Sequence, residues 1–511
     1  MEPLNLIDQL LKEQQSLTSV ERYSVYFDKK AEINAKPLYK DLIPITKPSE
    51  GEQYAFEVNL DQCSGCKACV TACHSLNGLD ESETWRATGV LVGTKDDQPY
   101  QQIITGACHH CVDPACQNGC PVLAYEKDET TGIVRHLDDQ CIGCQYCVLK
   151  CPYDVPKYNE ARGIVRKCDM CHSRLAVGEA PACVQACPHE AIVIRKVKKM
   201  EVLATKHDRI LFPGTITSHY TTPTTSYVSE RGMPATVLFG DDSKIIVEDG
   251  HTPLVMMLVF TQMAAGCFIG NEIQGFINTP NPFVDVMGWV ALMVGLTASI
   301  FHLGRPQIGW KAFLGWRKSW LSREVIAFGI FAFFSSATTF LSVARWMTFF
   351  LPHFLLQTPL RESAVIFGLA SIWCSIMVYV DTQRPSWRLP YTGFKFFGTT
   401  LVLGITTQAC FSPEWRIIGA ECFLTKIGVE TALYLLGVLQ FSSHLERSAK
   451  VILKKMSRIG VARITLGVAA ATTIFINPFI ALLLGLAGEL LERRLFFQTV
   501  IRYRMPGHIG S

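Results

Sequence analysis

Sixteen of the twenty cysteines of this chain lie in four groups between positions 63 and 187, and this clustering constrains the fold most. Two groups have the spacing C-x2-C-x2-C-x3-C, one has C-x2-C-x4-C-x3-C, and the last widens the middle gap to eleven residues. A proline directly follows three of the four groups, and proline suits the first turn of a helix. In chain order the groups are Cys63, Cys66, Cys69 and Cys73; Cys108, Cys111, Cys116 and Cys120; Cys141, Cys144, Cys147 and Cys151; and Cys168, Cys171, Cys183 and Cys187.

Such spacing is typical of ligands to iron–sulfur clusters. Three thiolates on one tight loop face three irons of a cubane, and the fourth cysteine, which we expect to start a helix, binds the neighbouring cluster. We therefore predict four [4Fe–4S] clusters in two pairs that exchange their fourth ligand. The predicted ligand sets are Cys63, Cys66 and Cys69 with Cys187; Cys168, Cys171 and Cys183 with Cys73; Cys108, Cys111 and Cys116 with Cys151; and Cys141, Cys144 and Cys147 with Cys120.

Other cysteine chemistries fit less well. Structural zinc uses two well-separated pairs, and only the fourth group has such a gap. Disulfides would require an exported domain, whereas residues 1–11 are charged and lack an apolar core, so we expect no secretory signal peptide. Each cluster carries one electron at a time. Four clusters in a row therefore predict electron transfer from one cluster to the next, with no substrate chemistry in this half.

The composition changes from residue 254 onward. Six apolar segments each approach the roughly 20 residues needed to cross a bilayer. A seventh stretch, 464–488, is interrupted by Asn477-Pro478; we predict two short spans joined by a tight turn, with a single kinked span as the alternative. The six segments are 254–277, 283–303, 325–344, 363–380, 394–411 and 417–441.

The predicted fold class is an α+β tandem ferredoxin-like four-cluster domain followed by an all-α transmembrane bundle of about eight helices. Only 18% of the residues are charged, below the roughly 25% of soluble proteins. The net charge of +3 argues against nucleic-acid binding. The predicted domains are a polar helical extension (1–50), the cluster domain (51–200), an extended linker without strong elements (201–252) and the membrane domain (253–511).

Basic residues divide unevenly across the predicted membrane. The loops on the side of the cluster domain hold eighteen Lys and Arg, and the opposite loops hold three. The positive-inside rule then places the cluster domain in the cytoplasm, with the protein in a bacterial inner membrane. If 464–488 is a single span, the loops on the side of the cluster domain still hold more Lys and Arg than the opposite loops.

Polar side chains near the predicted spans are candidates for function, because charges are costly in hydrocarbon. His302 and Glu324 flank the second and third spans on the cluster side, where they can bond a quinol hydroxyl and accept its proton. The alternative is that both residues only cap helix ends. Lys426 and Glu430, four residues apart, predict either mutual neutralisation or a proton path. We expect no haem, since only His302 and His444 lie near spans on one side.

The cluster half resembles the four-cluster electron-transfer subunit of membrane-bound dimethyl sulfoxide reductase and related molybdoenzymes, over roughly 55–195. The motifs that carry this resemblance are Cys141-Ile142-Gly143-Cys144 and Cys151-Pro152-Tyr153. Cys116 is kept, which implies a [4Fe–4S] and not a three-iron cluster at that group.

The membrane half resembles the anchor subunit of the same enzymes, which has eight helices and no haem. The motifs are Pro253-Leu254, His302-Leu303-Gly304 and Leu321-Ser322-x-Glu324. The resemblance implies a quinol site at His302, Gly304 and Glu324, with the two subunits fused in one polypeptide.

We predict an electron-transfer subunit that takes electrons from menaquinol or ubiquinol and passes them to a separate molybdopterin-containing reductase subunit. The predicted partners are that subunit, membrane lipid and the quinone pool, with no nucleic acid. The orientation favours a cytoplasmic partner of the nitrate reductase type over an exported one. The alternatives are a quinone-reducing subunit of a dehydrogenase, an ion-coupling membrane module that uses Lys426 and Glu430, and a zinc-bound scaffold.

Overall fold

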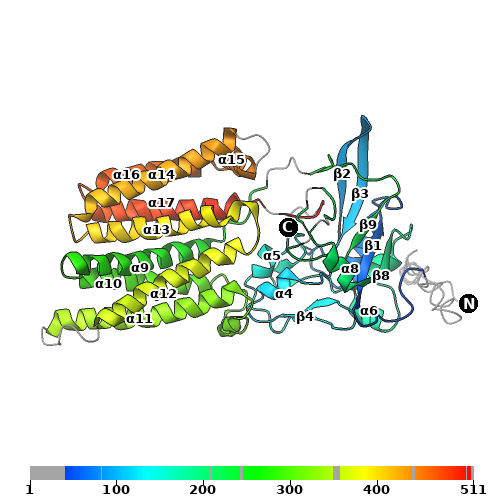
Figure 1. The fold of residues 1–511 in the computed structure, drawn as a ribbon, viewed down its shortest axis with the longest axis horizontal. Coiled ribbons are helices and arrows are strands. Elements are labelled where there is room, and N and C mark those ends of the chain that lie inside the picture. The colour runs from blue at the N-terminus through cyan, green and yellow to red at the C-terminus, as the bar shows by residue number, and fades with distance from the viewer. Residues whose placement is uncertain are drawn as a thin grey trace, which may run out of the picture.

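The structure, a computed structural model, describes residues 41–507 apart from positions 82, 208–209, 214, 218, 242–245, 349–356, 440–443 and 502. The predicted helical extension over residues 1–50 therefore lies mostly outside the described residues. Figure 1 shows the two halves end to end, with the long helices side by side on the left and the strand-containing half on the right.

The strand-containing half is closed by pairing between its two ends. β1 (Glu52–Asn59) runs antiparallel to β8 (Ile192–Lys198), with Phe56 opposite Ile194. Phe56 and Ile194 are both buried because alternate residues of each strand face one core. Six further strands pair as β2 (Ala87–Lys95) with β3 (Gln98–Gly106), β4 (Tyr125–Lys127) with β5 (Val134–His136) and β6 (Lys157–Asn159) with β7 (Ile164–Arg166).

Short helices follow the cysteine loops. Cys120 and Cys151 each end a helix in extended conformation, so the prediction that the fourth cysteine starts a helix is wrong. The following proline explains the difference, since the residue before a proline is disfavoured in helical conformation. The helices are α3 (Ala68–Leu76), α4 (Ala115–Gly119), α5 (Tyr146–Lys150), α6 (His172–Ala176), α7 (Ala182–Gln185) and α8 (Lys199–Ala204).

The second half consists of long helices joined by short connections. Four of the described helices are long and apolar enough to cross a membrane: Thr252–Ile277, Pro282–Ile300, Trp320–Met347 and Pro359–Val380. The elements are α9 (Thr252–Ile277), α10 (Pro282–Ile300), α11 (Trp320–Thr348), α12 (Gln357–Val380), α13 (Leu389–Ala409), α14 (Trp415–Leu439), α15 (His444–Lys455), α16 (Ser457–Thr473) and α17 (Pro478–Gln498). That every long helix spans the membrane stays a prediction.

The stretch 464–488 forms parts of two helices. Asn477 caps α17 by accepting hydrogen bonds from the backbone N–H groups of Phe479 and Ile480. Pro478 occupies the first helical turn, where its missing N–H is not needed. Figure 1 shows α16 and α17 side by side. An Asn-Pro pair also starts α10, where Asn281 caps the backbone of Phe283.

Large apolar side chains point outward from this half. Phe340 on α11 is 72% exposed and Leu483 on α17 is 66% exposed. Exposure of this kind along a whole helical half is costly in water, which favours a lipid surround for these helices.

Candidate functional site

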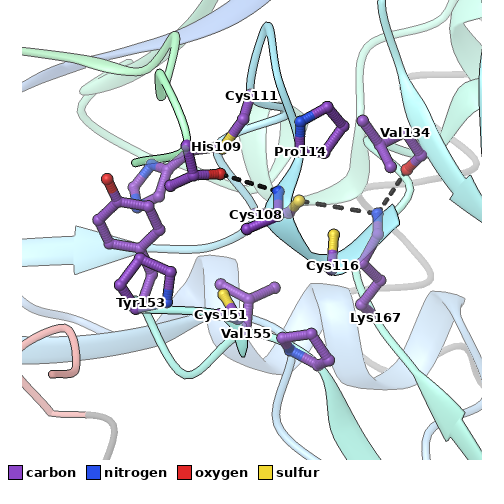
Figure 2. A pocket seen from close by; sticks show the side chains of 14 residues that line it. Cys108, His109, Cys111, Pro114, Cys116, Val134, Cys151, Tyr153, Val155 and Lys167 are labelled. Carbon is purple, nitrogen blue, oxygen red and sulfur yellow. Dashed lines mark hydrogen bonds between the residues drawn. The ribbon is translucent and has the colours of Figure 1, made fainter. Parts of the chain in front are cut away.

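Four cysteines of one predicted ligand set surround a single hollow in the strand-containing half. Cys108, Cys111 and Cys116 lie on the loop into α4 and on α4 itself, and Cys151 comes from the end of α5. Figure 2 shows these cysteines around the hollow, with Lys167 beside them. The structure thus brings together the set that the spacing predicts; that these sulfurs bind one cluster stays a prediction.

A second hollow is lined by Cys63, Cys66, Cys69 and Cys187, which is the predicted pairing of the first group with the last. The hydroxyl of Thr105 lies 3.7 Å from the sulfur of Cys69. Residues more than 110 positions apart therefore meet here, because β1 and β8 close the domain.

The other two ligand sets are also gathered. Asn77 donates its side-chain N–H to the sulfurs of Cys73 and Cys171, at 3.6 and 3.9 Å. One amide thus links members of two different cysteine groups, as ligand exchange requires. Cys120, Cys141 and Cys147 share one buried core, and Cys144 packs against it.

The surroundings of the cysteines supply hydrogen-bond donors to several sulfurs. Backbone N–H groups donate to sulfurs, for example Ala124 to Cys120 at 3.2 Å and Gly143 to Cys141 at 3.4 Å. Such donors stabilise the charge of cluster ligands. Zinc holds all its sulfurs about 2.3 Å from one point. Within the described ranges, no three His, Cys, Asp or Glu side chains are close enough to hold one metal ion.

Two buried basic side chains lie among the cysteines. Lys167 and Arg86 are each only 2% exposed. Burial opposes the charge of Lys167, but the sulfurs of Cys108 and Cys116 outweigh it and raise the pKa of Lys167 above its ordinary value. The sulfurs of the first and last cysteine groups likewise raise the pKa of Arg86 against the effect of burial. Both side chains are therefore cations inside the domain.

The segment 201–252, predicted as an extended linker without strong elements, carries the end of α8 and two short strands that pair within this domain. β9 (Ser226–Val228) pairs in parallel with β1, and β10 (Leu238–Phe239) pairs with β2. Thr224 donates its hydroxyl to the carbonyl of His109 at 2.7 Å, next to Cys108. Threonine hydroxyls that satisfy buried carbonyls explain why this polar run packs inward.

A cavity of about 310 Å³ lies where the two halves meet. The strand-containing half contributes Gln145, which directly precedes α5, and Leu149 of α5, the helix that carries Cys147. The helical half contributes two histidines, an arginine and aromatic rings: His251, His302, Arg384, Trp387 and Phe497. Charged side chains line it as well, namely Asp154, Lys157, Glu160, Glu248 and Asp249, so the cavity combines aromatic and polar surfaces.

His302 lies in the connection after α10 and faces this cavity. Its ring is hydrogen-bonded to the backbone of Cys144 and meets the ring of His251 edge to face at 5.4 Å. Burial and the nearby His251 lower the pKa of His302 to about 4, so the imidazole is neutral near pH 7. The sequence did not identify His251, Arg384 or Trp387; their only signal is a position next to a predicted span.

Gly304 and Glu324 do not line the described cavity. A side chain on Gly304 would overlap the backbone of Gly163, which lies in the turn between β6 and β7. Because Gly304 has no side chain, the connection after α10 can approach this turn closely. Glu324, near the start of α11, is 4% exposed and accepts a hydrogen bond from Ser375. It is near enough to Tyr146 of α5 to interact electrostatically. Their roles at a quinol site stay predictions.

Together these features define a class: an iron–sulfur electron-transfer protein joined to a helical membrane anchor. Residues 99–197 match the family described as 4Fe-4S dicluster domain, and residues 249–442 match the family described as DMSO reductase anchor subunit (DmsC). The protein belongs to the dimethyl sulfoxide reductase family of iron–sulfur subunits, fused here to the anchor subunit.

Similarity to curated proteins is concentrated in the iron–sulfur half. The "Probable anaerobic dimethyl sulfoxide reductase chain YnfG" of Escherichia coli is 36% identical over 180 residues, covering 34% of this chain and 86% of that protein. The "Hydrogenase-2 operon protein HybA" of the same species is 37% identical over 157 residues, covering 26% of this chain and 48% of that protein. The "Formate dehydrogenase-O iron-sulfur subunit" of Escherichia coli is 32% identical over 171 residues, covering 30% and 57%.

Proposed function

We propose that this protein oxidises membrane quinol and passes its electrons singly through four [4Fe–4S] clusters to a separate molybdopterin-containing reductase subunit. The observation that carries the proposal is the junction cavity, in which His302 contacts the backbone of Cys144. A quinol bound there is within a few ångströms of a predicted cluster ligand, so electrons have a short path.

Quinol oxidation releases two electrons and two protons, and His302 in the cavity is the first proton acceptor of the proposal. The neutral imidazole of His302 accepts a hydrogen bond from a quinol hydroxyl and then its proton. Glu324, outside the cavity lining and close to Tyr146, is the second proton acceptor of the proposal. Trp387, stacked on Phe496 at 5.3 Å, supplies an apolar wall for the ring of menaquinol or ubiquinol.

The partner and the orientation belong to the same proposal. Relatives named as dimethyl sulfoxide reductase chains and as a formate dehydrogenase subunit act within multi-chain enzymes by their names, which favours a molybdopterin-containing catalytic partner. The distribution of Lys and Arg favours a cytoplasmic position for the cluster domain (51–200) and a membrane domain over 253–511 with eight spans.

Replacing the cavity histidine tests the quinol site. We expect His302→Ala, and separately Glu324→Gln, to slow quinol-driven reduction of the clusters by about 10²-fold or more, because a positioned proton acceptor is lost. Rates are measured by stopped-flow bleaching of the cluster absorbance. His207→Ala, at an exposed histidine, is the matched control. Unchanged rates, with full cluster EPR signals after dithionite, would refute the assigned site.

Iron content tests the clusters themselves. Four cubanes predict about sixteen irons per polypeptide and a brown purified protein. A colourless, zinc-loaded protein would establish the scaffold alternative instead. Redox titration against the quinone couple decides direction: cluster potentials below that of the quinone pool would favour the dehydrogenase alternative.

Ion coupling is the second candidate function, and one observation favours testing it. Lys426 lies 3.3 Å from Glu430 and also contacts Glu489, deep in the helical half. Proteoliposomes that oxidise quinol without moving ions would eliminate this candidate. Movement abolished by Lys426→Met, with electron transfer retained, would establish it.

A further inference from the structure

Lys167 lies between two cysteine groups and contacts a residue of each. It directly precedes Cys168, and its ammonium reaches back to lie 3.6 Å from the sulfur of Cys108. It donates further hydrogen bonds to the carbonyl of Val134 and, at 2.8 Å, to that of Cys168. Figure 2 shows the side chain directed at the hollow that Cys108 and Cys116 line.

This contact joins the two predicted cluster pairs. Cys108 belongs to the pair of clusters formed by the second and third cysteine groups (the inner pair), whereas Cys168 belongs to the pair formed by the first and last groups (the outer pair). An electron that passes between the pairs therefore passes Lys167. The inference rests on the proposed function in this respect only, since it requires the clusters at these cysteines.

Among the described residues, Lys167 forms no direct ion pair with a carboxylate, although Asp169 is close enough to interact with it electrostatically. Lys150 pairs with Asp381 at 2.6 Å, and Lys157 pairs with Asp154 at 2.7 Å. The hydrogen-bond acceptors of Lys167, by contrast, are carbonyl oxygens and a cysteine sulfur. An ammonium buried in a medium of low dielectric acts strongly on charges a few ångströms away.

A cluster that gains one electron gains one negative charge and no proton. A fixed cation beside it favours that reduced form and raises its potential. We propose that Lys167 sets the reduction potentials of the clusters at Cys108 and Cys168, and so controls electron passage between the inner and outer pairs.

Arg86 provides an internal comparison. It interacts electrostatically with Cys69, Cys73, Cys168 and Cys183, all in the outer sets, and its guanidinium lies 4.8 Å from the ring centroid of Phe56. Its charge therefore acts on the two outer clusters. Lys167 and Arg86 share only the cluster at Cys168. Substitutions at these two positions are therefore expected to shift different sets of cluster potentials.

The test is a redox titration of the purified full-length protein with dithionite, followed by EPR and without quinol. We expect Lys167→Gln, which keeps a donor but loses the charge, to lower two of four potentials. A tenfold change in the reduction equilibrium corresponds to about 59 mV for one electron. Lys167→Arg is expected to retain the native potentials, as is Lys198→Met at an exposed lysine paired with Glu201. Arg86→Gln is expected to lower the potentials of the clusters at Cys69 and Cys168, and only the cluster at Cys168 is shared with Lys167→Gln.

Each outcome of this titration either supports or overturns the inference about Lys167. Loaded Lys167→Gln protein with four unshifted potentials overturns the inference. If Lys167→Gln and Lys167→Met both fail to bind iron while Lys167→Arg binds it with shifted potentials, the role is structural and the inference is also overturned. Absence of any [4Fe–4S] signal in the native protein would instead refute the proposed function.

Discussion

At the scale of single residues, Gly304 shows how a short motif gains its meaning from the fold. The resemblance of its motif, His302-Leu303-Gly304, to the anchor-subunit family implies a part in quinol binding. In the structure its backbone lies against Gly163 and Gly143, two glycines with positive φ in the cluster half. Only glycine on all three positions lets these backbones meet, so Gly304 fixes the connection that carries His302.

We predict that Gly304→Ala displaces this connection. The added Cβ would overlap the Gly163 carbonyl, and neither partner is a flexible side-chain end, so a backbone shift is required. The expected result is at least a tenfold loss of quinol-driven cluster reduction, since small misplacements at a reacting site have such effects.

Dithionite-reduced EPR signals should persist in that variant. Gly393→Ala is the matched control, because a side chain on Gly393 meets no atom within 4 Å. Equal rates for both variants would contradict the steric argument.

At the scale of elements, four helices of the second half are held by a buried network of charges. Arg463 of α16 donates to Glu489 of α17 at 2.8 Å and lies 3.2 Å from Glu430 of α14. Lys395 of α13 pairs with Glu492 at 2.7 Å. The sequence singled out Lys426 and Glu430 alone; the structure makes them part of a network, which supports neutralisation as their role. Its members are Lys395, Lys426, Glu430, Arg463, Glu489, Glu492 and Arg493.

Glu489 is the centre of this network, and we predict that Glu489→Gln destabilises the helical half by about 3–5 kcal/mol. Its neutralisation leaves Lys426 and Arg463 buried with Glu430 as the one carboxylate among the described residues that both still contact. The measurement is the unfolding midpoint in detergent, followed by helical circular dichroism. Glu421→Gln, at an exposed position of α14, should leave the midpoint unchanged. A midpoint for Glu489→Gln equal to that of the control would show that the network contributes no stability.

At the scale of the whole molecule, the two halves meet through polar contacts and not only through the cavity. Lys150 of α5 forms an ion pair with Asp381, just beyond α12, at 2.6 Å. The hydroxyl of Tyr146 donates to the carbonyl of Val378 at 2.9 Å, and Arg384 donates to the carbonyl of Leu149 at 3.2 Å. α5, which carries Cys147, is thereby fixed against the anchor.

A double-mutant cycle on Lys150→Met and Asp381→Asn measures this coupling. We predict an interaction energy of about 0.5–3 kcal/mol, because the two side chains are in contact and largely buried. Electron transfer from quinol should slow in each single variant and partly recover in the double variant. Additive effects on both unfolding and rate would mean that the pair does not join the halves.

Much of this protein can be inferred from local sequence. Cysteine spacing predicts which sulfurs belong together because a cluster loop is only about ten residues long. Span lengths predict the long helices, and Asn477-Pro478 predicts the break between α16 and α17. Cys120 and Cys151 end helices and do not start them, because the proline that follows each disfavours helical conformation at the cysteine. The inward packing of Thr224 does not follow from local sequence, because its hydrogen-bond partner His109 lies over 100 residues away.

The amino-acid sequence by itself therefore determined the chemistry: iron–sulfur ligands, an apolar helical half and the family to which both belong. Ligand type and hydrophobic length are properties of short segments, so they can be read without a fold. Only the tertiary structure decided where those segments meet. The junction cavity at His302, the charge of Lys167 between two cysteine groups and the network around Glu489 all depend on packing between distant segments, because electrostatic and steric effects act through space and not along the polypeptide.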